Sequence, residues 1–253
     1  MKTEAVHWDK IAKTYEDEIF DVFRSTKKGK LKSIVQQYAG KGKFAIDFGC
    51  GTGKALPLLS PLFYKILAVD ISQKCLDIAK TAGYKNVEFE RVDLAAKKNN
   101  IPAADFAFCC NVAIGDDNKR NFSILSNVVK SLKKGGTAVI VIPSLESASF
   151  SAWQTTKVYE SEGVKMKDIP VAEFDHLTPA HHERIQEGIF FIDGHPTKHY
   201  LFAELFSFFN TGNYKVQNID RLEYNWDTEI TNPPKWLRDP YPWDWVVEVK
   251  RVK

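Results

Sequence analysis

The chain has 253 residues, of which 44% are hydrophobic and 26% charged, proportions that are typical of a globular domain and exclude a disordered or fibrous protein. Its net charge of +3 is too small to indicate nucleic acid or a membrane surface as the partner. No apolar run reaches the ~18 residues of a membrane span, and the N-terminal sequence lacks a signal peptide's apolar stretch, so we expect a cytoplasmic protein. Four cysteines without C-x-x-C spacing are expected to be small buried side chains rather than disulfides or zinc ligands.

Residues 1–43 predict a helical lead-in, because apolar side chains recur there at helical spacing. Residues 44–143 alternate apolar runs with helical patterns. Strands are predicted at 44–48, 65–70, 86–93, 106–110 and 137–142, with the third near a sheet edge and the fourth in the centre. Apolar strands that alternate with helices indicate a parallel sheet covered on both faces. The predicted fold class is therefore a doubly wound, mostly parallel α/β domain.

Residues 144–198 show few periodic signals and are expected to form an irregular insert that acts as a substrate lid. A helix over 199–209 and strands over 216–224 and 245–252 follow. The whole chain, 1–253, is thus predicted to be one domain with a cofactor-binding core at 44–143 and a C-terminal part at 199–253.

The segment Asp47–Gly53, Asp-Phe-Gly-Cys-Gly-Thr-Gly, lies between the first strand and the next helix, at the edge where open α/β sheets bind ligands. Its glycines let the backbone pass close to a ligand and are expected to aim the N–H groups of a helix start at an anionic group. Asp70 ends the second strand, where a carboxylate can accept both ribose hydroxyls, and Asp93 ends the third.

Four segments resemble, in order and spacing, the motifs of the class I S-adenosylmethionine-dependent methyltransferases. They are Ile46–Gly53, Val69–Ser72, Arg91–Leu94 and Leu132–Gly136, and Trp8–Tyr15 resembles the lead-in of many small-molecule members. The resemblance covers residues 8–143 well and fails over 144–198. It implies a seven-stranded sheet with one antiparallel strand, which 245–252 could supply, with S-adenosylmethionine as the cofactor and S-adenosylhomocysteine as the product.

The resemblance also implies roles for single positions at the methionine end of the cofactor. Asp47 would bind its amino group, Asn111 would lie beside the sulfonium, and Tyr15 would close over it. The turn residues that would line the methionine part are Gly49, Cys50, Gly51 and Gly53.

At the nucleoside end, Asp70 would hold the ribose and Ile71 would pack on the adenine. Asp93 and the backbone of Leu94 would read the adenine edge. Each of these residues also has a purely structural alternative. The glycines could form only a tight turn, and Asp70 could be an acid at a helix start. Asp93 could be a solvated strand end, and Tyr15 a core residue.

Two other functions fit parts of the pattern. A nicotinamide-dependent reductase also needs a glycine turn, but Lys54 stands where G-x-G-x-x-G requires its last glycine, and no Tyr-x-x-x-Lys pair occurs. A cofactor-binding partner subunit without catalysis is the non-enzyme alternative. Metal dependence is not expected, because Asp116-Asp117-Asn118 reads as a helix start and His195-Pro196 as a helix entry.

The acceptor class predicted from the sequence is a small organic molecule, and nucleic acid is not expected. A hydroxyl or acidic carbon would need a base, for which His181 and His182 in the insert are the candidates, with surface histidines as the alternative. Aromatic side chains could line an apolar acceptor pocket or pack the insert, and packing is favoured. They are Phe150, Trp153, Tyr241, Trp243 and Trp245.

Overall fold

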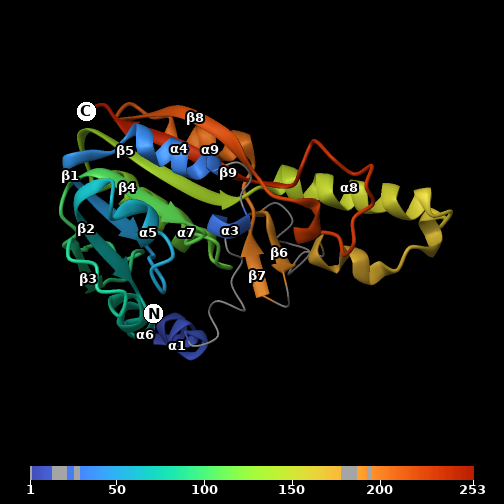
Figure 1. The fold of residues 1–253 in the computed structure, drawn as a ribbon, viewed down its shortest axis with the longest axis horizontal. Helices are drawn as coiled ribbons and strands as arrows, with labels where there is room; N and C mark the ends of the chain where they lie inside the picture. Colours follow the sequence, from blue (N-terminus) through green and yellow to red (C-terminus); the bar gives the residue numbers. More distant parts are fainter. Residues whose placement is uncertain (1, 13–21, 26–28, 178–186, 193–194) are drawn as a thin grey trace.

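The computed structural model describes residues 2–12, 22–25, 29–177, 187–192 and 195–253. Its centre is a seven-stranded sheet in the order β3-β2-β1-β4-β5-β9-β8 (Figure 1). β1 to β5 pair in parallel, and β9 runs antiparallel to both of its neighbours. The strands are β1 (Gly40–Phe48), β2 (Phe63–Asp70), β3 (Val87–Arg91), β4 (Ala104–Cys110), β5 (Leu132–Pro143), β8 (Tyr214–Glu223) and β9 (Trp243–Arg251). The predicted fold class is confirmed, with β3 at an edge, β4 in the centre and the last strand inserted antiparallel.

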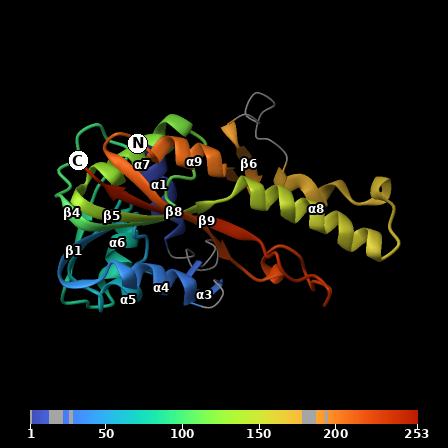
Figure 2. The ribbon, with the colours of Figure 1, turned by 90° about the horizontal axis from the view of Figure 1, so that it is seen from above.

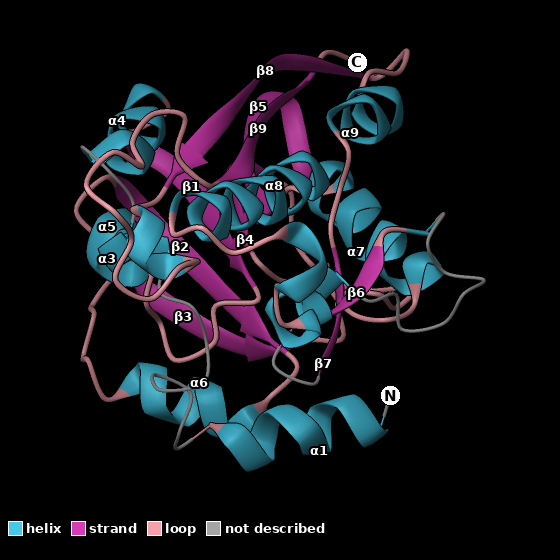
Figure 3. Ribbon diagram, turned by 90° about the vertical axis from the view of Figure 1, so that its right-hand side faces the viewer, coloured by secondary structure: helices cyan, strands magenta, loops and turns pink. Residues whose placement is uncertain are grey.

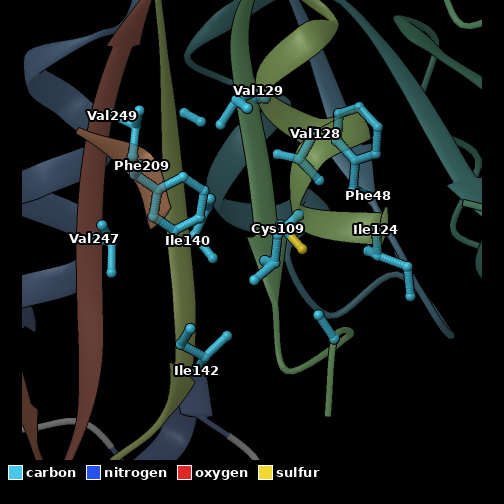
Figure 4. Close-up of a cluster of buried hydrophobic side chains, with 14 of the residues drawn as sticks. Phe48, Cys109, Ile124, Val128, Val129, Ile140, Ile142, Phe209, Val247 and Val249 are labelled. Atoms are coloured by element: carbon cyan, nitrogen blue, oxygen red, sulfur yellow. The ribbon is translucent and has the colours of Figure 1, made fainter. Parts of the chain in front are cut away.

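Helices cover both faces of the sheet, which is why its central strands are apolar on both sides (Figure 3). One face carries α4 (Lys30–Gln37), α5 (Leu56–Leu59) and α6 (Gln73–Lys80). The other carries α7 (Asn118–Lys130) and α9 (Phe202–Phe209). Figure 4 shows this second face, where side chains of α7 and α9 pack on β4, β5 and β9; those labelled include Val128, Phe209, Ile140 and Val247.

Two predicted helix starts are confirmed by their caps. The Ser72 hydroxyl accepts the N–H of Cys75 at 3.1 Å before α6, and the Asp117 carboxylate accepts two N–H groups of the first turn of α7. The lead-in comprises α1 (Lys2–Ile11) and α3 (Val22–Ser25) before α4, and α1 lies beside α6 (Figure 3).

The expectation of an irregular insert is wrong for its first part, because α8 (Leu145–Ser161) is a helix of 17 residues. Its buried side chains are mostly small or hydroxyl-bearing: Ser147, Ser151, Ala152, Thr155, Thr156 and Val158. A search for large apolar residues at helical spacing does not count such a face, so the helix gave no periodic signal. Two short 3-10 helices follow, η2 (Met166–Asp168) and η3 (Val171–Leu177).

A hairpin of β6 (Ile189–Ile192) and β7 (His195–Lys198) ends the insert. The prediction of a helix entry at His195-Pro196 is wrong, since Pro196 pairs with Phe191 in this hairpin and α9 begins only at Phe202. Proline is tolerated in such a two-stranded sheet because each strand has a free edge.

α8 projects beyond the sheet, and residues 225–242, which include η5 (Trp226–Thr228), run beside it (Figures 1 and 2). We call α8, η2, η3 and residues 225–242 the arm. Val158 packs there with Trp226 and Leu237 in a cluster separate from the two clusters of the sheet. The predicted packing role of the aromatic residues is confirmed for Phe150, whose ring lies 5.8 Å from that of Trp226. Trp153 is half exposed instead.

None of the helices in the described part of the chain combines the length and the apolarity needed to cross a membrane.

Candidate active site

The glycine turn follows β1 at the carboxyl edge of the sheet. Gly49, Gly51 and Gly53 have φ angles of 66°, 52° and 90°, in the left-handed region that costs other residues about 1–2 kcal/mol. A Cβ atom on Gly49 would lie 2.3 Å from a methyl carbon of Val112. These positions therefore require glycine for backbone conformation, and Gly49 also for close packing.

Four N–H groups of this turn are hydrogen-bonded within the protein. The donors and their distances are Gly49 at 2.8 Å, Cys50 at 3.0 Å, Gly51 at 2.9 Å and Gly53 at 2.8 Å. The acceptors are the carbonyl oxygens of Val69 and Cys50 and the carboxylate of Asp70. These four N–H groups therefore serve the turn itself, and the expectation that N–H groups of the helix start face an anionic group stays a prediction.

Asp70 fixes both the glycine turn and the start of α6. Its Oδ2 accepts the Gly51 N–H at 2.9 Å, and its Oδ1 accepts the Ser72 N–H at 2.8 Å. Burial raises the pKa of Asp70, and these hydrogen bonds oppose the rise. A carboxylate has about four lone-pair sites, so Asp70 can accept hydroxyl groups from a ligand as well.

Asp47 lies at the end of β1 and is 2% exposed. Burial, together with the nearby charge of Asp70, raises the pKa of Asp47 to about 8. Its Oδ2 has no hydrogen-bond partner in the described part of the chain. Because an unpartnered buried polar atom is costly, this oxygen fits a donor that comes from a ligand.

Asp93 follows β3 and forms an ion pair with Arg120 of α7, whose Nη2 lies 2.8 Å from Oδ1. Burial alone would raise the pKa of Asp93, but hydrogen bonds from Arg120 and the Ala95 N–H outweigh it and lower the pKa. Asp93 is therefore an anion that is already held by Arg120, while the adjacent Leu94 is buried at 5% exposure.

A cavity of about 60 Å³ joins these elements. The predicted residues that line it are Gly49, Asp70, Ile71, Leu94 and Asn111, and the residues that were not predicted are Trp8, Cys75, Val112, Arg120 and Ile124. The predicted residues Asp47, Cys50, Gly51, Gly53 and Asp93 are not among those that line it. This volume admits a few water molecules and is far below the ~300 Å³ of an ordinary ligand pocket. A nucleoside can enter only if side chains such as Trp8 and Val112 move.

α1 is fastened over this cavity by Asp9. Its Oδ1 accepts the Ser72 hydroxyl at 2.6 Å and the Lys74 N–H at 3.2 Å. The hydrogen bond from Ser72 contributes most to lowering the pKa of Asp9. The neighbouring Trp8 thereby becomes part of the cavity wall.

Asn111 follows β4 with a φ of 53°, and its N–H donates to the Val141 carbonyl at 2.9 Å. Its Oδ1 is buried without a partner in the described part of the chain. Its side chain lies close to Asp244 of β9, whose Oδ2 accepts the Tyr224 hydroxyl at 2.7 Å. Burial raises the pKa of Asp244 to about 6, although Tyr224 and Asn111 oppose the rise.

A second pocket, of about 260 Å³, lies in the arm. It is lined by Ser151, Thr155, Ala172, Glu173 and Glu229. Desolvation raises the pKa of Glu229 to about 7, and the charge of Asp244 adds to the rise. No local pattern in the sequence marks Glu229 or Asp244, because the arm and β9 bring them together only in the folded chain.

The methyltransferase domain family matches residues 45–136. A probable S-adenosylmethionine-dependent methyltransferase of Saccharomyces cerevisiae is 28% identical over 104 residues, which are 41% of this chain. They are 31% of the yeast protein, so the match spans about a third of that relative. Residues 45–136 are therefore similar to the methyltransferase domain family, which agrees with the resemblance seen in the sequence motifs.

Solved structures show the same fold. A methyltransferase from Methanosarcina mazei superimposes with a TM-score of 0.62 at 18% identity, covering 87% of this chain and 98% of that one. A complex named DhpI-SAM-HEP gives 0.61 at 16% identity, covering 98% and 96%. Both cover most of this chain, beyond the part matched in sequence.

Several predicted site residues stay untested. Tyr15, His181 and His182 lie outside the described residues. Of the other histidines, His195 is exposed on β7, whereas His199 is buried with its Nδ1 3.2 Å from the Thr197 carbonyl oxygen. Among the residues that the structure describes, no three acidic, histidine or cysteine side chains form a metal-binding group.

Proposed function

We propose that this protein transfers a methyl group from S-adenosylmethionine to a small organic acceptor. The observation that carries the proposal is the unpartnered Oδ2 of Asp47, buried beside a glycine turn of which four N–H groups are bonded within the protein. Such a site suits a ligand that brings a cationic donor, as the amino group of a methionine does. The match of residues 45–136 to the methyltransferase domain family supports the same cofactor.

The residues around the cavity would hold the cofactor from end to end. Asp47 would bind the amino group, with the turn residues Gly49, Cys50, Gly51 and Gly53 along the methionine chain. Asp70 would accept the ribose hydroxyls through its remaining lone pairs. Asn111 would lie beside the sulfonium, where its unpartnered Oδ1 can meet a positive centre.

At the adenine end, Ile71 and Leu94 supply apolar contact and line the cavity. Asp93, held by Arg120, would accept the adenine amino group with an oxygen lone pair that the ion pair leaves free. We propose in the same way that Tyr15 closes over the sulfonium.

The bound cofactor would supply an already activated methyl group. What this chain adds is alignment of the acceptor with that group and exclusion of water. α1 can exclude water, because it covers the cavity and its Trp8 lines the wall. A base is needed only if the acceptor is a hydroxyl, an acidic carbon or a protonated amine.

A nicotinamide-dependent reductase is less well supported, because Lys54 stands where the G-x-G-x-x-G fingerprint requires its last glycine. A thermal-shift comparison separates the two. S-adenosylhomocysteine at 100 times its dissociation constant adds about 2.7 kcal/mol of stability, so the midpoint should rise by roughly 5–10 °C. A shift with NADPH and none with S-adenosylhomocysteine would overturn the proposal. Cofactor binding without turnover on any acceptor would indicate the non-catalytic partner subunit.

A further inference from the structure

We infer that the pocket in the arm is the acceptor subsite and takes a small molecule that presents an amino group. This inference rests on the proposed methyl transfer and names its substrate class. The observations that carry it are the pocket's buried hydroxyl, the charges on its walls and its connection to the cofactor cavity.

The pocket is formed by three segments of the arm. α8 contributes Ser151 and Thr155, η3 contributes Ala172 and Glu173, and Glu229 follows η5. Its volume of about 260 Å³ suits a molecule smaller than an ordinary drug-sized ligand.

Ser151 is the buried polar group that a ligand would satisfy. The residue is 2% exposed, and its Oγ has no hydrogen-bond partner in the described part of the chain. The hydroxyl lies close enough to the Glu229 carboxyl to lower its pKa, but without the geometry of a hydrogen bond. A buried hydroxyl in this state fits a ligand group that bonds to it and to Glu229 together.

The charged side chains that line the pocket are both acidic, Glu173 and Glu229. Glu173 is held in place by the Tyr159 hydroxyl, which donates to its Oε1 at 2.8 Å. The lysine of this part of α8, Lys157, is paired with Glu160 at 2.7 Å and is not among the lining residues. Two carboxyl groups with no lining cation among the described residues favour a cationic ligand over a neutral or anionic one.

The pocket is coupled to the cofactor cavity through Asp244. Asn111, which lines the cofactor cavity, lies close enough to Asp244 to lower the pKa of that carboxyl, and Asp244 in turn lies close enough to Glu229 in the pocket to raise the pKa of Glu229. Asp244 thus stands between Asn111, beside which the sulfonium is proposed to lie, and the acceptor held at Glu229.

Methyl transfer to an amine in this pocket begins with removal of a proton from the acceptor. Glu229 takes a proton from the ammonium group of the acceptor, which frees the nitrogen lone pair. That pair forms the new C–N bond while the C–S bond breaks and its electrons stay on sulfur, so that the sulfonium becomes a neutral thioether. A carboxylate that lines the pocket, as that of Glu229 does, is placed to accept this proton.

The test uses the full chain saturated with S-adenosylhomocysteine and three probes of similar length: 1,3-diaminopropane, 1,3-propanediol and malonate. Calorimetry at one ionic strength should detect the diamine alone. Glu229→Gln should weaken diamine binding at least tenfold, while Glu160→Gln, which removes the same charge from α8 outside the pocket, should leave it unchanged. With S-adenosylmethionine, a panel of two- to six-carbon amines should give methylated products by mass spectrometry, and the matched alcohols should give none.

The inference fails if the diamine does not bind, if the diol or malonate binds as tightly, if Glu229→Gln binds the diamine like the unmodified protein, or if no amine of the panel is methylated. S-adenosylhomocysteine binding, measured on the same samples, tests the proposed function separately. Normal cofactor binding with any of these failures overturns the inference alone. Absent cofactor binding overturns the methyltransferase proposal first and the acceptor subsite with it.

Discussion

Asp70 holds Gly51 across 19 residues of sequence, because its Oδ2 accepts the Gly51 N–H at 2.9 Å. The two residues meet because β1 and β2 pair in parallel with Phe48 opposite Val69, so that both strands end at the same edge. The acid that is proposed to hold the ribose therefore also shapes the turn that is proposed to hold the methionine part. Changes at either residue are expected to affect both halves of the cofactor site.

Asp70→Asn should weaken S-adenosylhomocysteine binding by more than tenfold and destabilise the protein by about 1–3 kcal/mol, since an amide cannot accept both N–H groups. Calorimetry and urea unfolding measure the two effects. Asp77→Asn, on the exposed side of α6, is the matched control and should change neither. Unchanged binding in Asp70→Asn would remove Asp70 from the cofactor site.

Asp47 should make cofactor binding depend on pH. Its pKa of about 8 means that the carboxyl is protonated at pH 7 and must release that proton to bind an ammonium group. The affinity for S-adenosylhomocysteine should rise by up to about tenfold per pH unit between pH 6 and 8, and calorimetry in buffers of different ionisation enthalpy should show proton release. Asp47→Asn should bind weakly with no such dependence; a pH-dependent affinity in this variant would contradict the assignment.

The same shift predicts the pH dependence of folding without ligand. The folded state keeps a proton that the unfolded state loses above the ordinary pKa of 3.8, so the free energy of unfolding should fall as pH rises toward 8. The slope due to this group is at most about 1.4 kcal/mol per pH unit. Melting curves of the protein and of Asp47→Asn isolate the effect, because the other groups are common to both; parallel curves would show that Asp47 does not titrate in this way.

Gly49→Ala should destabilise the protein through two separable causes. The new Cβ would lie 2.3 Å from Val112, an overpacking that costs about 1–3 kcal/mol, and the φ of 66° adds about 1–2 kcal/mol. Adding Val112→Ala should recover the first part and leave the second. Urea unfolding of the two single variants and the double variant measures the coupling; strictly additive effects would mean that the two side chains do not meet.

Asp9→Ala should release α1 from α6 and speed the dissociation of S-adenosylhomocysteine. The lost hydrogen bond to the Ser72 hydroxyl is worth about 1 kcal/mol, which corresponds to roughly a fivefold change in rate. Stopped-flow fluorescence can follow Trp8, which lines the cavity. Lys10→Ala, an exposed change on the same helix, is the control. Equal dissociation rates in both variants would show that α1 does not cover the bound cofactor.

The sheet could be predicted from the sequence because its strands are apolar runs with strong local signals. The helix α8 could not, since its buried face consists of residues such as Ser151 and Thr155 that serve exposed positions equally well. The candidate cofactor site was predictable in so far as its residues end consecutive strands. Val112 and Arg120 were missed because only tertiary packing brings their side chains to the cavity.

The separate cluster of Val158, Trp226 and Leu237 gives the arm a local stability of its own. Opening at the far end of the arm would break these contacts and leave most of the packing of helices on the sheet in place, so it is a sub-global fluctuation rather than global unfolding. Amide protons of α8 should accordingly exchange with deuterium well before those of β4 and β5. An acceptor could then be admitted and released many times during one lifetime of the folded sheet.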